Sequence, residues 1–154
     1  MEIKYFCPHW GSKHLDFDDC LSKVKNAGYD GVEMSLPLDK NEREATVQLI
    51  KKYRLLHIAQ HWETTKGNFQ EHRKEYRERL LDLASAHPLF INSQTGKDFF
   101  SFEQNAELIR LASEVSLGSD GIGFVEILNA GSSSPRSRQL RWGCRPSNRI
   151  GRFR

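Results

Sequence analysis

The stretch AGYDGVE, residues 27–33, joins the end of one predicted helix to the start of one predicted strand. Upstream, Asp16 stands where a helix N-cap is expected, and apolar residues follow it at helical spacing. Gly28 then supplies the left-handed residue with which many helices stop. Downstream, a short apolar run over residues 31–36 ends at Pro37 and predicts a strand. The stretch therefore predicts a helix-to-strand junction.

The same alternation of short apolar runs and longer amphipathic runs extends along the chain in both directions. Strands are predicted over residues 3–7, 31–36, 55–62, 89–93 and 121–128. Helices are predicted after Asp16, over 42–53, over 70–86 and after Ser101, which forms a capping-box pattern with Gln104. A repeat of about 25 to 33 residues is typical of βαβ units, which have parallel strands and right-handed crossovers. The predicted fold class is therefore α/β.

Two architectures share this repeat, and the periodicity does not separate them. One is a piece of a (β/α)8 barrel, and the other is an open, doubly wound sheet. No G-x-G-x-x-G follows the first strand, so a dinucleotide-binding sheet has no support. A flavodoxin-like sheet of five strands remains open on length alone.

Charge divides the 154-residue chain into two parts. Residues 1–130 hold 16 Lys and Arg and all 20 Asp and Glu, whereas residues 131–154 hold 7 Arg and no acid. The net charge of +3 therefore averages an acidic body with a basic tail. The tail has no apolar periodicity, and we expect it to be disordered or to come from a shifted reading frame. The predicted domain is residues 1–130.

Other composition signals exclude several classes of protein. No run of 18 apolar residues exists, which argues against a transmembrane helix, and the first ten residues do not resemble a signal peptide. A cytoplasmic location is therefore expected. The three cysteines, Cys7, Cys20 and Cys144, include no C-x-x-C pair, so neither a disulfide framework nor a zinc knuckle is expected.

The charged run at residues 71–79 is interpreted as a solvated helix face, held by pairs four residues apart such as Glu75 with Arg79. His57 is interpreted as a core residue. The remaining histidines outside strand ends are interpreted as surface or loop residues: His14, His72 and His87.

Polar side chains follow all five predicted strands. In parallel β/α folds the active residues come from the carboxyl ends of the strands, so these positions are the candidate site. Glu33 lies between apolar neighbours in its strand, where burying a carboxylate costs several kcal/mol unless it is paired. Glu126 has the same setting in the fifth strand. The candidate substrate-binding residues are His9, Trp10, Glu33, His61, Gln94, Lys97 and Asp98.

Three segments together resemble one known family. AGYDGVE at 27–33, AQHW at 59–62 and INSQTGKDFF at 91–100 resemble the xylose-isomerase-like barrel superfamily of sugar phosphate isomerases and epimerases. This superfamily also contains the apurinic endonuclease family 2 fold. The resemblance covers about residues 1–128 and implies an eight-stranded barrel of about 250 to 280 residues. About five of the eight β/α units are expected here, and an incomplete barrel of this kind is expected to be inactive.

The resemblance also implies a metal-dependent reaction. Its members hold a divalent metal (Mg, Mn or Zn) with ligands on strands five to eight, and Glu126 falls at the strand-five position, with Asn129 after it. Glu126 is thus the expected metal ligand and catalytic carboxylate. The His-Glu-Thr-His-like fifth strand found in the branch suggested by residues 91–98 is absent. The implied chemistry is proton transfer next to the carbonyl of a carbohydrate, with the metal polarising that carbonyl.

Two other functions stay open. A non-enzymatic half-barrel could assemble with a partner chain, or self-associate, through open sheet edges. A weaker alternative is an endonuclease-like or nucleic-acid-binding relative, because the basic tail also carries Trp142 and Phe153. Nucleic acid and membrane are not expected partners.

Overall fold

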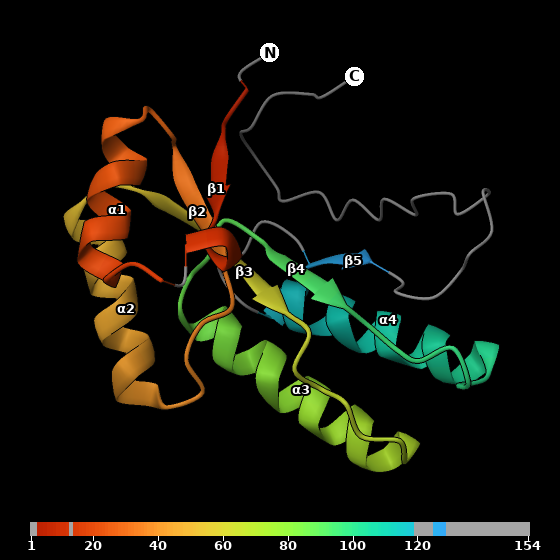
Figure 1. The fold of residues 1–154 in the computed structure, drawn as a ribbon. Helices are drawn as coiled ribbons and strands as arrows, with labels where there is room; N and C mark the ends of the chain where they lie inside the picture. Colours follow the sequence, from red (N-terminus) through yellow and green to blue (C-terminus); the bar gives the residue numbers. More distant parts are fainter. Residues whose placement is uncertain (1–2, 13, 119–124, 129–154) are drawn as a thin grey trace.

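The structure is a computed structural model, and it describes residues 3–12, 14–118 and 125–128. Figure 1 shows strands and helices alternating along the chain. The strands are β1 (Phe6–Pro8), β2 (Gly31–Met34), β3 (Leu56–His61), β4 (Ile91–Gln94) and β5 (Val125–Leu128). The helices are the short 3-10 helix η1 (His9–Ser12), α1 (Phe17–Asn26), α2 (Lys40–Lys52), α3 (Phe69–Ser85) and α4 (Phe102–Gly118).

The order of the strands decides between the two architectures. All neighbouring pairs are parallel, and the order across the sheet is β1-β2-β3-β4-β5. A flavodoxin-like sheet would instead reverse direction at a switch point, giving the order 2-1-3-4-5. Because every crossover runs the same way, the helices lie along one face of the sheet (Figure 1). The described units therefore have the arrangement of consecutive units of a (β/α)8 barrel, and the α/β fold class is confirmed.

Local signals in the sequence place the helix ends. Asp16 caps α1 and accepts a hydrogen bond from the backbone N–H of Asp18 at 2.9 Å, and Gly28 has φ of 83° just past the helix end. The capping box of Ser101 and Gln104 forms in both directions, at 2.9 and 3.2 Å. The sequence prediction missed Asp39, the N-cap of α2, so the helix begins at Lys40, two residues before its predicted start.

The core lies between the sheet and the helices. Successive side chains along a strand point to opposite faces of the sheet. Val32, Ala59 and Ile91 are buried against the helices, and their neighbours in each strand point to the other face. All four α-helices contribute large, fully buried side chains to the core: Leu21, Ile50, Tyr76, Leu80, Leu83 and Leu108. The face away from the helices corresponds to the inside of a barrel.

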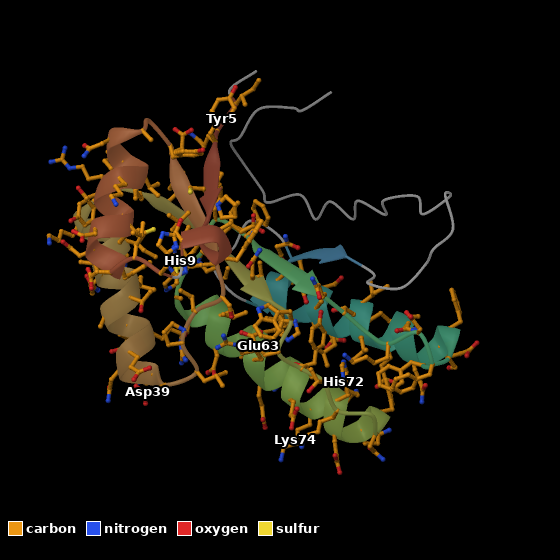
Figure 2. The ribbon with its side chains drawn as sticks, viewed as in Figure 1. Tyr5, His9, Asp39, Glu63, His72 and Lys74 are labelled. Carbon is orange, nitrogen blue, oxygen red and sulfur yellow. The ribbon has the colours of Figure 1, made fainter. Side chains whose placement is uncertain are left out.

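His72 corrects one expectation. It is 1% exposed, not on the surface, and its ring packs edge-on against Phe100 with centroids 5.1 Å apart. Figure 2 shows its neighbour on the helix, Lys74, pointing away from the sheet. The charged residues on either side of His72 hid this core position in the sequence. His57 is buried, as predicted.

Some sequence predictions lie outside the described residues: the basic tail at 131–154, Cys144 and Asn129. Among the helices that the structure describes, none combines the length and the apolar character that a membrane crossing needs.

Candidate active-site cleft

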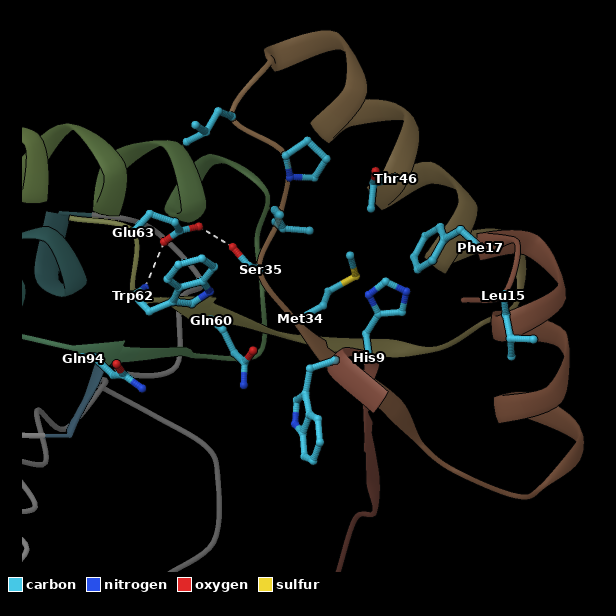
Figure 3. A pocket seen from close by; sticks show the side chains of 14 residues that line it. His9, Leu15, Phe17, Met34, Ser35, Thr46, Gln60, Trp62, Glu63 and Gln94 are labelled. Carbon is cyan, nitrogen blue, oxygen red and sulfur yellow. Dashed lines mark hydrogen bonds between the residues drawn. The ribbon is translucent and has the colours of Figure 1, made fainter. Parts of the chain in front are cut away.

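A cleft of about 870 Å³ opens at the carboxyl ends of the first strands. This is the end of the sheet where enzymes with parallel β/α folds place their active sites. Figure 3 shows side chains from several strand ends converging on it. The polar and aromatic lining residues are His9, Trp10, Phe17, Ser35, Thr46, Gln60, Trp62, Glu63 and Gln94. His9, Trp10 and Gln94 were predicted, and the structure brings them to one cleft.

Two tryptophans border this cleft and remain largely uncovered. Trp10 is 68% exposed and Trp62 is 53% exposed. An indole ring presents a flat apolar face beside a polar N–H, so it suits a ligand with an apolar face and polar edges. His9 is held by edge-on packing against Phe17, with centroids 5.2 Å apart. These aromatic surfaces favour a ring-shaped polar ligand over a purely apolar one.

Glu63 supplies the carboxylate of the cleft and is held on several sides. Its Oε1 lies 2.8 Å from Nη2 of Arg79 and accepts a hydrogen bond from the Ser35 hydroxyl. Its Oε2 accepts the backbone N–H of Trp62 at 2.9 Å (Figure 3). The side chain of Arg79 is only 6% exposed, and its guanidinium also donates to the backbone carbonyl of Leu36. The cluster therefore fixes the loop after β2 against the end of β3.

The environment of Glu63 sets its charge. Burial works to raise the pKa of Glu63, but hydrogen bonds from Ser35, the Trp62 backbone and Arg79 outweigh it and hold that pKa below its usual value. Glu63 is therefore ionised at neutral pH and acts as a hydrogen-bond acceptor. A proton donor in catalysis would need the opposite shift.

Three side chains meet on the face of the sheet that points away from the helices. Glu33 Oε1 accepts hydrogen bonds from Nε2 of Gln60 at 3.0 Å and from Nδ2 of Asn92 at 2.8 Å. They come from β2, β3 and β4. A carboxylate only accepts, so each amide must turn its NH2 group toward it and its oxygen away. Glu33 itself is not among the cleft-lining residues, but Gln60 is.

A smaller cavity of about 180 Å³ adjoins the cleft. Lys97 and Asp98 line it, as does Thr64. Trp62 and Gln94 line both spaces, so the two lie next to each other. The predicted pair Lys97 and Asp98 thus lies beside the cleft and contributes no lining to it.

His61 corrects a second expectation. It was expected to share a pocket with Glu33, but it lies on the opposite face of β3 and is 1% exposed. Its ring nitrogens lie 3.0 Å from Ser93 Oγ and 2.8 Å from Thr64 Oγ1. Burial, to which the charges of Arg79 and Lys97 add, lowers the pKa of His61 to about 4 despite the nearby Glu63. His61 is therefore a neutral residue of the core, without access to the cleft.

Within residues 3–12 and 14–118, no three His, Cys, Asp or Glu side chains are grouped so that they could hold a metal ion. The carboxylate oxygen of Glu33 that faces Gln60 and Asn92 is occupied by their N–H donors. Glu126 lies in β5 with its Cα in register with Asn92, and its side chain lies outside the description. The catalytic and metal-binding roles of Glu126 stay predictions.

Arg79 is the site residue that the sequence most clearly hid. It was expected to pair with Glu75 on a solvated helix face, but it is buried and pairs with Glu63. Its position three residues after Tyr76, also buried, is a helical spacing that marks the inner face of α3. Sequence reasoning also missed Glu63, which directly follows the predicted strand over 55–62, and it missed Gln60 and Ser35.

Comparison with known proteins finds one fold. No protein-family model matches the chain, and no curated protein does. Among solved structures, the chain is similar to a sugar phosphate isomerase/epimerase from Parabacteroides distasonis, with a TM-score of 0.57 and 13% sequence identity. The match covers 81% of this chain and 55% of that one, so the chain spans about half the length of that protein. Over that match the two chains share one fold, the parallel (β/α) barrel arrangement that the sequence resemblance predicted.

Proposed function

We propose that this chain forms the sugar-binding part of an isomerase or epimerase that moves a proton next to a sugar carbonyl. The observation that carries the proposal is the cleft at the carboxyl ends of the strands, where Trp10 and Trp62 flank the polar groups of Gln60 and Glu63. Aromatic faces beside fixed acceptors match a ligand with many hydroxyl groups. The similarity in fold to a sugar phosphate isomerase/epimerase supports the same class of ligand.

In this proposal the described residues bind the sugar. Glu63 is held ionised by its donors, so it accepts hydroxyl hydrogen bonds without exchanging a proton. The proton transfer is assigned to Glu126, which the family resemblance also makes a ligand of a divalent metal (Mg, Mn or Zn). The metal, when bound, would polarise the sugar carbonyl. The resemblance places further metal ligands on strands six to eight, and the described strands are the first five, so we expect the chain to bind sugar without isomerising it.

Tryptophan fluorescence tests the binding step. The intact chain is titrated with D-xylose, D-fructose and D-fructose 6-phosphate, and with cyclohexanol as an apolar ring. At least one sugar is expected to give a saturable change with a dissociation constant of about 1 mM or lower. The variant carrying both Trp10→Phe and Trp62→Phe should lose that change. A straight-line response to every sugar, or saturation by cyclohexanol alone, would rule out a sugar-binding cleft.

Two further measurements test the division of labour. Titration calorimetry with Mn²⁺ is expected to show weak or no binding, and a dissociation constant of about 1 µM would contradict this. In heavy water with Mn²⁺ present, the sugar that binds is expected to gain no deuterium next to its carbonyl. Deuterium incorporation would contradict this, because the chain would then transfer the proton without metal ligands from strands six to eight.

Assembly through sheet edges is a second candidate function. Within the described residues, β1 pairs with β2 alone, so one edge of β1 has no strand beside it. An unpaired strand edge is a template for another strand. Self-association or a partner chain would cover it, and light scattering after size-exclusion chromatography tests this. A monodisperse monomer would count against self-association. The cytoplasmic location stays a prediction.

A further inference from the structure

The amide of Gln60 is a cleft-lining polar group whose orientation is fixed by a hydrogen bond. Gln60 lines the cleft between strand ends, and its Nε2 donates to Glu33 Oε1 at 3.0 Å. With the NH2 group turned toward that carboxylate, the amide oxygen is the atom left for a ligand. The cleft therefore has a directional group at this point, an acceptor, which binds donors such as hydroxyl hydrogens.

The amide of Asn92 holds Glu33 where it accepts the hydrogen bond from Gln60. Nδ2 of Asn92, from β4, donates to the same Oε1 at 2.8 Å. The carboxylate of Glu33 is thus fixed from two strands and cannot rotate away from Gln60 without breaking two hydrogen bonds. Breaking them would leave polar groups unpaired in a partly buried place, which costs more than the bonds contribute when formed.

We propose that Glu33 is a positioning residue, which acts on ligand recognition through Gln60 by keeping the amide oxygen of Gln60 turned toward the cleft as an acceptor for a substrate hydroxyl. Glu33 then makes no contact with the ligand. This deepens the proposed sugar-binding function and rests on it for the ligand, but the orientation of Gln60 is a property of the free protein. Glu33 and Gln60 together would select polyhydroxy compounds over ligands that only accept hydrogen bonds at that position.

Side-chain amide NMR tests the orientation without any ligand. In the intact protein, the Nε2 protons of Gln60 are expected to resonate apart from those of exposed glutamines such as Gln48, because they donate to a carboxylate. Glu33→Gln should move them toward the exposed position, whereas Glu44→Gln, at a side chain that is 64% exposed on α2, should leave them unchanged. A Gln60 signal that ignores Glu33→Gln would overturn the proposal.

Binding of xylitol, a neutral polyol used as the probe, tests the consequence. Glu33→Gln and Gln60→Leu are each expected to weaken xylitol binding about threefold to tenfold, the range of one hydrogen bond. Because Glu33 acts through Gln60, the double variant should bind no more weakly than Gln60→Leu alone. Additive losses would mean that Glu33 touches the ligand itself, and this would overturn the positioning role.

The two readouts separate the possible failures. If no variant and not even the wild-type chain binds xylitol or any sugar, the proposed function fails, and the NMR result still decides the orientation of Gln60. If Glu33→Gln lowers stability so far that it does not fold, Glu33→Asp is the second variant: it keeps the carboxylate but shortens the side chain, which withdraws the acceptor from Gln60 Nε2. The proposal predicts that Glu33→Asp weakens xylitol binding and moves the Gln60 amide protons toward the exposed position, and no change in either would contradict it.

Discussion

Glu33 on β2 and Asn92 on β4 are joined by a hydrogen bond of 2.8 Å although β3 lies between their strands. Side chains from next-nearest strands meet readily where a sheet is concave, and this is the face that becomes the inside of a barrel. The bond thus links the fold to the site, because it spans the strands whose ends form the cleft.

A second negative charge beside Glu33 should lower the stability of the fold. Asn92→Asp replaces a donor with a second carboxylate beside Glu33, and it should lower the free energy of unfolding by about 1–3 kcal/mol at neutral pH. Urea denaturation of the variant measures this. Gln48→Glu, the same change at an exposed position of α2, is the control and should be within about 0.5 kcal/mol of wild type. An equal effect at both positions would mean that the Glu33–Asn92 bond contributes nothing.

Breaking the buried Arg79–Glu63 ion pair should lower the free energy of unfolding far more than breaking a surface pair. Arg79→Met leaves the Glu63 carboxylate without its cation in a place where the Glu63 side chain is 20% exposed. It should lower the free energy of unfolding by about 3–5 kcal/mol. Lys40→Met removes the cation of the exposed Lys40–Glu44 pair and should change it by less than about 1 kcal/mol. Similar losses in both variants would refute the role given to Arg79.

Acid should destabilise the fold through its buried histidines. Burial lowers the pKa of His57 and of His61 from 6.5 to about 4. Between pH 6.5 and 4 the unfolded chain therefore binds more protons than the folded chain, so stability falls as the pH falls. Each histidine contributes a slope of up to about 1.4 kcal/mol per pH unit in that window.

A single substitution isolates the contribution of His61. The free energy of unfolding is measured by urea denaturation at pH 7.0, 5.5 and 4.5. It should fall less steeply with falling pH in the His61→Gln variant than in wild type. The exposed His14→Gln change is the matched control and should keep the wild-type slope. If His61→Gln and wild type lose stability in parallel, the buried ring of His61 is not what senses the acid.

The glycine that starts β2 leaves no room for a side chain. A Cβ on Gly31 would lie 2.4 Å from the backbone oxygen of Leu56 and 2.5 Å from the ring of Phe6. Gly31→Ala should therefore cost about 1–3 kcal/mol of stability, because the strands on both sides must shift. Gly67→Ala, where nothing lies within 4 Å, is the control and should be nearly neutral. Thermal unfolding of both variants measures the difference, and equal midpoints would argue against the close packing of Phe6 and Leu56 on Gly31.

The elements of this fold could be predicted because their signals are local. Asp16 and Ser101 cap helices through atoms two or three residues away, and Gly28 ends a helix through its own backbone. The strand order could not be predicted from such signals, since both architectures share one repeat. It is set by the packing of the whole sheet.

The site was predicted only in part for a related reason. The structure places Trp10 and Gln94, both predicted from their positions at strand ends, in one cleft. The face of a strand residue depends on register, however, and a shift of one position moves His61 to the core while Gln60 faces the cleft. The partner of Arg79, Glu63, lies 16 residues away in the loop after β3, which helical spacing does not reveal.

The most direct test of a sugar-binding cleft at the strand ends is to map where a sugar binds. Backbone amide shifts of the ¹⁵N-labelled chain are followed during titration with D-xylose, or with the tightest-binding sugar from the fluorescence titrations. The account predicts that the largest shifts cluster after β1, β2, β3 and β4, at Trp10, Ser35, Trp62 and Gln94. Shifts gathered at the opposite ends of the strands, or no shifts at saturating sugar, would contradict it.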